Sequence, residues 1–114
     1  MLDIGITQRG TYHLVRLSGE LTADDVSRLS HNIGERIVGP GARLALDLSQ
    51  LRLIDSAGLS DLIHLVTRAR LTEGRVVLVA PSPFVSGILA VTRLDQWFEI
   101  VPTQGDAERE LGAT

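Results

Sequence analysis

Apolar and polar residues alternate over the first part of the chain. Leu2, Ile4 and Ile6 alternate with polar residues or glycine, and a similar run covers residues 12–17. The two runs are separated by a polar turn at residues 9–10. Alternation with a period of two is typical of strands, and a short polar connection between two such runs predicts an antiparallel hairpin near a sheet edge.

The period then changes to a helical one. Apolar residues with helical spacing follow Thr22 at Val26, Leu29, Ile33 and Ile37. Thr22 and Asp25 have the spacing of a capping pair, and the run 39–41 (Gly-Pro-Gly) is a strong helix stop. The pattern predicts a first helix between Thr22 and Gly39.

Two short runs are almost entirely apolar, at residues 44–48 and 76–80. Such runs are typical of strands that are buried on both faces of a parallel sheet. Between them, residues 56–72 have helical periodicity. The order strand, helix, strand predicts a right-handed crossover.

The last third of the chain continues this alternation. Ser82 and Pro83 provide an N-cap and a proline at the first helical position, which predicts a helix to about Leu94. Residues 98–101 are expected to form the last strand. Residues 103–111 are expected to form a short helix with Thr103 and Asp106 at its start and Ala107 and Leu111 on its apolar face. The sequence therefore predicts one α/β domain over residues 1–114, with a mixed sheet of about five strands and about four helices.

The predicted helix over residues 56–72 has two different faces. At 100° per residue, one arc contains Leu59, Leu62, Ile63, Val66 and Ala69, and we expect it to pack on the sheet. Ser60, His64, Thr67 and Leu71 lie on the other side, within about 80° of Ser56. Ser56 itself is expected to be the N-cap, at a helix end that also favours negative charge.

Composition excludes several classes of function. The chain has 114 residues, 44% of them hydrophobic, a formal charge of −3 and no cysteine. Its basic residues are all arginine and are scattered, which argues against a nucleic-acid surface and against lysine chemistry. No apolar run approaches the roughly 20 residues that span a bilayer, and the N-terminus does not resemble a signal peptide. We therefore expect a cytoplasmic protein without membrane or nucleic-acid contacts and without a metal or cofactor.

A catalytic triad of Asp55, Ser56 and His64 is not expected. On one helix, Ser56 and His64 would lie about 12 Å apart, whereas proton transfer needs about 3 Å. His13 and His31 have no spacing that would pair them with Ser56, and no nucleophile-elbow, Walker or metal-ligand motif is present. The sequence predicts that the protein is not an enzyme.

Several motifs together resemble the STAS family, the sulphate transporter and anti-sigma factor antagonist domains. They are Leu-Ser-Gly-Glu-Leu at 17–21, Leu-Asp-Leu-Ser at 46–49, Ile-Asp-Ser-Ala-Gly-Leu at 54–59, Val-Val-Leu-Val-Ala-Pro at 76–81 and the apolar segment 88–94. The resemblance spans nearly the whole chain. It implies a mixed sheet with helices packed against one side, and it is greatest to the free-standing bacterial antagonists.

In that branch, a partner that is both an anti-sigma factor and a serine kinase phosphorylates the serine of the Asp-Ser-x-Gly motif, which is Ser56 here. The resemblance implies that the unmodified protein binds this partner and frees the sigma factor, and that phosphorylation releases it. A phosphatase would reverse the modification. The protein itself would be a monomer or a weak dimer.

The resemblance also implies a partner-binding surface around Ser56. We expect it to comprise Gly19, Glu20, Thr22, Asp24, Asp55, Ser56, Ala57, Gly58, Ser60, His64 and Thr67. Thr22 stands where family members often have aspartate, and it could equally be a plain N-cap. Ala57 stands where many relatives have a second serine, which leaves Ser56 as the one candidate hydroxyl of the motif.

Two other roles within the same family remain open. The chain could be a scaffold subunit of the stressosome type, or the small STAS component of a membrane-lipid transport system. The first would form a large assembly, and the second would bind an ATPase at the membrane.

Overall fold

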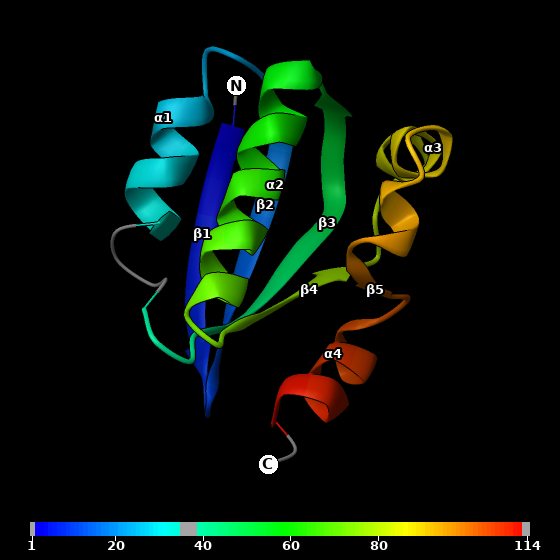
Figure 1. Ribbon diagram of the computed structural model, residues 1–114. Helices are drawn as coiled ribbons and strands as arrows, with labels where there is room; N and C mark the ends of the chain where they lie inside the picture. Colours follow the sequence, from blue (N-terminus) through cyan, green and yellow to red (C-terminus); the bar gives the residue numbers. More distant parts are fainter. Residues whose placement is uncertain (1, 35–38, 113–114) are drawn as a thin grey trace.

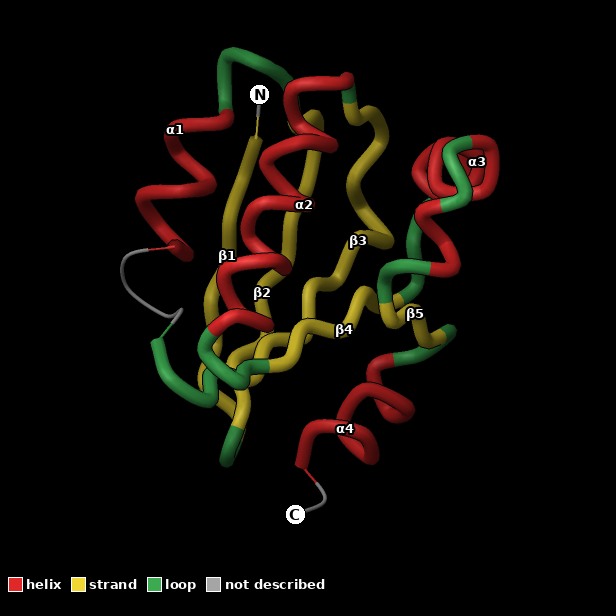
Figure 2. Tube along the Cα trace, viewed as in Figure 1, coloured by secondary structure: helices red, strands yellow, loops and turns green. Residues whose placement is uncertain are grey.

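Five strands form one sheet in the order in which they occur along the chain. The computed structural model describes residues 2–34 and 39–112. Its elements are β1 (Leu2–Arg9), β2 (Tyr12–Leu21), α1 (Val26–Leu29), the π-helical turn η1 (Ser30–Gly34), β3 (Arg43–Ile54), α2 (Ser56–Leu71), β4 (Arg75–Val79), α3 (Pro83–Val91), the 3-10 turn η2 (Leu94–Gln96), β5 (Glu99–Val101) and α4 (Gln104–Gly112). Figures 1 and 2 show the strands with helices around them. The α/β mixed sheet of five strands and four α-helices confirms the predicted fold class.

The first two strands form the predicted hairpin. β1 and β2 pair antiparallel from Leu2↔Gly19 to Arg9↔Tyr12, and Gly10 occupies the turn with a positive φ of 59°. β2, β3, β4 and β5 then pair parallel to one another. The parallel part places the ends of β2 and β3 at the same edge of the sheet, where the helices that follow them begin.

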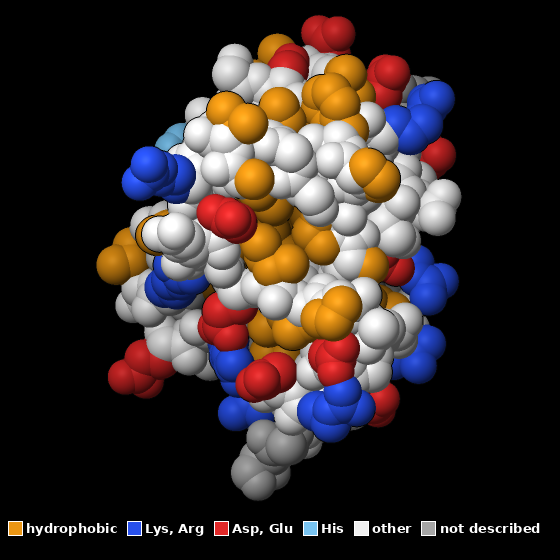
Figure 3. Space-filling view, turned by 90° about the vertical axis from the view of Figure 1, so that its right-hand side faces the viewer, with side chains coloured by type: hydrophobic (Ala, Val, Ile, Leu, Met, Phe, Trp, Pro, Cys, Tyr) orange, Lys and Arg blue, Asp and Glu red, His pale blue; other side chains and the backbone are white. Residues whose placement is uncertain are grey.

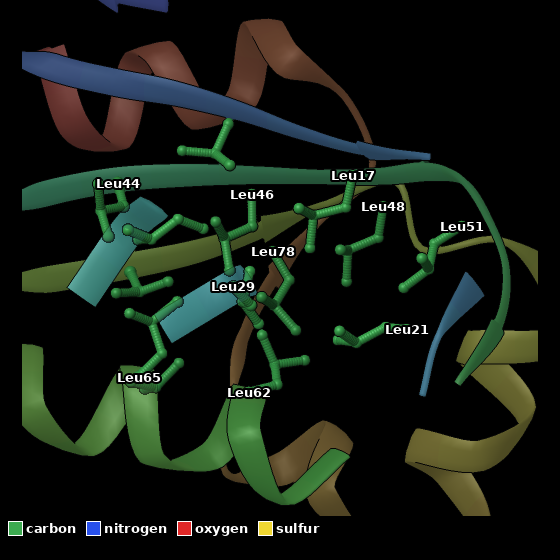
Figure 4. Close-up of a cluster of buried hydrophobic side chains, with 14 of the residues drawn as sticks. Leu17, Leu21, Leu29, Leu44, Leu46, Leu48, Leu51, Leu62, Leu65 and Leu78 are labelled. Carbon is green, nitrogen blue, oxygen red and sulfur yellow. The ribbon is translucent and has the colours of Figure 1, made fainter. Parts of the chain in front are cut away.

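One face of the sheet carries the larger core. Figure 4 shows leucines of β2, β3 and β4 directed toward α2, among them Leu17, Leu46 and Leu78. Helix α2 buries Leu62, Leu65, Val66 and Ala69, whereas Leu59 and Ile63 are only partly buried. The predicted apolar arc is therefore correct except for a small rotation that brings Leu65 into the core.

Helix α4 covers the opposite face of the sheet. Its Ala107 and Leu111 are buried with Tyr12, Leu14, Ala45, Val77 and Val79. Thr103 caps the helix, because the Asp106 N–H donates to Thr103 Oγ1 at 3.1 Å. The short C-terminal helix is thus confirmed, but the expectation that all helices pack on one side is wrong. This helix explains why the 44–48 and 76–80 segments are apolar on both faces.

An arginine network joins α4 to the sheet. Arg75 at the start of β4 donates to Glu99 of β5 at 2.6 Å and to Glu110 of α4 at 3.0 Å. These two carboxylates raise the pKa of Arg75 above its ordinary value. The charge network and the apolar contacts together hold α4 on its face of the sheet.

Some boundaries differ from the predictions. α1 begins at Val26, since residues 22–25 form a turn in which the Asp25 N–H donates to Thr22 O at 2.9 Å. Leu29 and Ile33 are buried as predicted, while the side chain of Val26 and the whole of Ile37 lie outside the described parts.

Two other elements differ in length from the predictions, β3 being longer and α3 shorter. β3 continues to Ile54 through the polar residues that follow Leu48, and α3 ends at Val91 with a separate turn after it. The Ser82 cap and the Pro83 start of α3 are confirmed. No helix within residues 2–34 and 39–112 is long and apolar enough to cross a membrane.

Candidate functional site

The junction between β3 and α2 centres on Asp55 and Ser56. Asp55 has extended backbone angles (φ −98°, ψ −178°) and its Oδ1 accepts the N–H of Gly58 at 2.8 Å. This is N-cap geometry, and Ser56 is the first residue of the helix. The expectation that Ser56 caps α2 is therefore wrong, because the neighbouring carboxylate has that role. The Ser56 side chain is exposed, and its hydroxyl makes no hydrogen bond to another described residue.

Asp55 also forms hydrogen bonds with the end of β2 and the loop that follows it. Its Oδ2 accepts the N–H of Ala23 at 3.1 Å, and its own N–H donates to Leu21 O at 3.2 Å. The hydrogen bond from Gly58, with a further one from Ala23, lowers the pKa of Asp55 below its ordinary value. One carboxylate thus joins two segments that are far apart in the sequence.

Gly58 allows the helix to approach this loop. A Cβ built on Gly58 would lie 2.2 Å from Leu21 O, which is far inside a normal contact distance. Leu21 O is also the acceptor for the Asp55 N–H. The glycine of the Asp-Ser-x-Gly motif is therefore required by packing between α2 and the end of β2, in addition to any role in binding.

The other predicted loop residues lie beside the start of α2. Gly19 has a φ of 92° next to a register shift between β2 and β3, a conformation that favours glycine. Glu20 pairs with Leu53 and is half-buried, and Asp24 is exposed. Thr22 is not a helix N-cap, and its hydroxyl donates to Asp25 Oδ2 at 3.2 Å. The structure therefore brings the 19–24 segment and the Asp55–Gly58 turn together.

The outer face of α2 continues from this junction. Ser60, His64 and Thr67 are all exposed, and the Thr67 hydroxyl donates to Ile63 O at 2.8 Å. Leu71 at the end of the helix is 79% exposed. The stripe predicted from the helical wheel is thus on the surface, in line with Ser56.

Charge around Ser56 is acidic. Asp55 precedes it, Asp24 is exposed on the fastened loop, and no basic residue occurs in the first turn of α2. The first backbone N–H groups of α2 and the helix dipole partly offset this charge. A phosphate on Ser56 could therefore be held at the helix end, while it would add strongly to the negative potential of the surface.

The sequence interpretation missed a second surface. Four large apolar residues on α3, directly after η2 and on β5 have exposed fractions of 36–84%: Phe84, Val91, Trp97 and Ile100. Figure 3 shows apolar side chains gathered on the face of the molecule that carries these elements. The signal was present in the sequence, since residues 76–92 contain no charged side chain.

Comparison with known proteins connects this geometry to a family. Residues 4–102 match the family model described as Mlab, STAS domain. Among solved structures, a candidate anti-sigma factor antagonist from Thermotoga maritima is 21% identical with a TM-score of 0.88, covering 96% of this chain and 94% of that one. An anti-sigma factor antagonist from Mycobacterium paratuberculosis is 24% identical with a TM-score of 0.84, covering 98% and 95%.

The anti-sigma factor antagonist SpoIIAA, solved in its unphosphorylated form, is 18% identical with a TM-score of 0.72 over 100% of both chains. The phosphorylated form of SpoIIAA from Bacillus is also similar, with 19% identity, a TM-score of 0.69 and coverage of 96% and 99%. At these identities the structural likeness establishes a shared fold.

Proposed function

The chain belongs to the STAS domain family, and from that premise we propose that it is an anti-sigma factor antagonist whose partner binding is controlled by phosphorylation of Ser56. The unmodified protein binds an anti-sigma factor that is also a serine kinase, and sigma-factor-dependent transcription is thereby released. The observation that carries the proposal is the exposed Ser56 hydroxyl. Asp55 caps the helix in its place, so Ser56 is available to another protein.

The physical effect of the modification is local. A phosphoserine adds about −1.5 to −2 charge next to Asp55 and Asp24. At the start of α2 this charge is compatible with the fold, because the helix end favours anions. In an interface that fits a neutral hydroxyl, it introduces bulk, desolvation and repulsion. A loss of roughly 3 kcal/mol of interface energy weakens binding about a hundredfold.

The residues around Ser56 divide into two roles in this proposal. Asp55 and Gly58 hold the β2–α1 loop against α2, so that Glu20, Thr22 and Asp24 contribute to the same surface. The exposed stripe of Ser60, His64 and Thr67 extends the contact along the helix. The protein is a substrate and not an enzyme, ATP is bound by the partner, a phosphatase resets the switch, and the exchange occurs in the cytoplasm.

Binding of variants to an anti-sigma serine kinase from the same organism tests the proposal. Calorimetric titration is expected to show that Ser56→Asp weakens binding by about a hundredfold, whereas Ser56→Ala binds like the wild type. Ser86→Asp is the control for added charge, because Ser86 is also exposed near the start of a helix, α3; since its hydroxyl donates to Pro81 O, circular dichroism verifies that this variant is folded. If Ser56→Asp binds as tightly as the wild type, the proposal is wrong.

A second function within the family is supported by two observations. The description of the matching family model, Mlab, STAS domain, does not mention sigma factors. The apolar face over α3 and β5 also lies outside the Ser56 surface. A scaffold or lipid-transport subunit would bury more than one surface. Two measurements on cell extract distinguish these roles. In gel filtration, a stressosome-type subunit elutes in a large assembly. On purification of the protein, a transport subunit co-purifies with a membrane ATPase.

A further inference from the structure

The outer edge of β1 is open to a further strand. β1 is the first strand of the sheet, and among the residues that the structure describes it pairs only with β2. The Leu2 carbonyl accepts a hydrogen bond from the Arg28 guanidinium and is therefore directed away from β2. Because backbone groups alternate in direction along a strand, Ile4, Ile6 and Gln8 also direct their N–H and C=O groups outward.

Within the described residues, the part of this edge after Ile4 lacks the features that usually prevent strands from pairing. The register between β1 and β2 is uninterrupted over all eight residues, and β1 contains no proline and no lysine. Gly5, Ile6, Thr7, Gln8 and Arg9 are all exposed. In Figure 1, α1 lies near the N-terminal end of β1, and the Arg28 contact at Leu2 is consistent with that position.

We propose that β1 pairs antiparallel with β1 of a second copy of the chain, on a two-fold axis at Ile6. The two five-stranded sheets would then form one continuous sheet. The outward N–H and C=O groups of Ile6 pair with those of Ile6 in the second copy, and those of Ile4 pair with Gln8. An isologous contact of this kind closes as a dimer, because each copy uses its one β1 edge in the contact.

Charge specifies this register. With the axis at Ile6, Asp3 of each copy lies opposite Arg9 of the other, in the closer type of antiparallel pair, whose Cα atoms are about 4.5 Å apart. Asp3 and Arg9 are exposed and have no ion-pair partner within the described chain. Moving the axis by one residue would place Asp3 opposite Thr7, or Arg9 opposite Gly5. Only the register centred on Ile6 forms two ion pairs.

The expected dimer is weak and leaves Ser56 itself accessible. One pair of strands buries an area at the low end for specific interfaces, so association should be reversible and dependent on concentration. Leu2 at the start of β1 pairs with Gly19, but β2 separates β1 from β3, which leads into Ser56. Each dimer would therefore present two Ser56 side chains to partners. This inference does not depend on the proposed function.

Sedimentation velocity over a range of concentrations tests the pairing. Asp3→Arg and Arg9→Asp each place like charges opposite one another, and each should weaken dimerisation by about tenfold or more. The double variant Asp3→Arg/Arg9→Asp exchanges the two charges and should restore association. Glu108→Arg is the control, because it makes the same charge change as Asp3→Arg on the exposed face of α4. Circular dichroism verifies that each variant is folded.

Cysteine cross-linking tests the register, since the natural chain contains no cysteine. Ile6→Cys should form a disulfide-linked dimer, because the paired Cα atoms would be about 5.5 Å apart. Gln8→Cys should not, because its two copies would be about 14 Å apart. A wild type that remains monomeric up to about 1 mM, a charge exchange that fails to restore the dimer, or equal cross-linking at both positions would overturn the proposal.

Discussion

At the residue scale, two roles that the sequence analysis gave to Ser56 belong to two residues. Asp55 caps the helix, and Ser56 remains the proposed phosphorylation site. Serine and aspartate are about equally good N-caps, so the pattern alone could not decide which of them starts the helix. A tertiary contact favours Asp55 as the cap: the N–H of Ala23, 32 positions away in the sequence, donates to the second Asp55 carboxylate oxygen. The motif could be found in the sequence, but this tertiary contact could not. As a result, the Ser56 hydroxyl does not cap the helix and makes no hydrogen bond to another described residue.

Asp55 should make stability depend on pH in acid. Its pKa is lowered in the folded protein, so the unfolded chain binds a proton more readily. The stabilising contribution of Asp55 is therefore complete well above the ordinary aspartate pKa of about 3.9, and it is lost as the pH falls through the lower, folded-state pKa.

Asp55→Asn keeps only one acceptor oxygen and no charge, and it should unfold at a lower temperature than the wild type near neutral pH. The difference between the two proteins should shrink below about pH 4 in thermal unfolding followed by circular dichroism. Asp24→Asn is the control, because Asp24 is exposed and should change the unfolding temperature little. A difference that stays constant down to pH 2 would contradict the role given to the Asp55 charge.

At the scale of elements, the sequence predicted the order of strands and helices but not how far they extend. β3 continues through Ser49, Gln50 and Arg52, where polar residues hide the strand pattern and the pairing with β2 shifts in register. The short π-helical turn after α1 has no clear sequence signal. Ala107 and Leu111 indicated that α4 has an apolar face, but not that this face covers the second side of the sheet.

The contact between α2 and the end of β2 predicts an unusual effect of alanine. Glycine to alanine within a helix ordinarily stabilises a protein by about 0.4–1 kcal/mol. Gly87→Ala in α3 should behave this way, because the added methyl group would have no atom within 4 Å beyond its chain neighbours and the adjacent backbone of its own helix. Gly58→Ala should instead destabilise by about 1–3 kcal/mol, because its methyl group would lie 2.2 Å from Leu21 O. Urea unfolding of both variants measures the two free energies, and a stabilised Gly58→Ala would show that the two segments are not held together.

At the scale of the whole molecule, the sheet is what assembles the site. Parallel pairing of β2 with β3 brings Leu21 beside Ile54, so the loop after one strand and the helix after the next become a single surface. The family resemblance predicted which residues form a partner-binding surface, and the structure places the loop after β2 in contact with the start of α2. The open edge of β1 and the apolar face over α3 and β5 lie on other elements. The protein therefore has separate surfaces that can form more than one protein contact at the same time.

The most direct test of the switch is to map the phosphate. The protein is incubated with ATP and the anti-sigma serine kinases of its own organism, and the wild type and Ser56→Ala are then compared by mass spectrometry. We expect one phosphate on Ser56 of the wild type and none on the variant. Phosphate at another residue, or no phosphate with any of these kinases, would contradict the central claim.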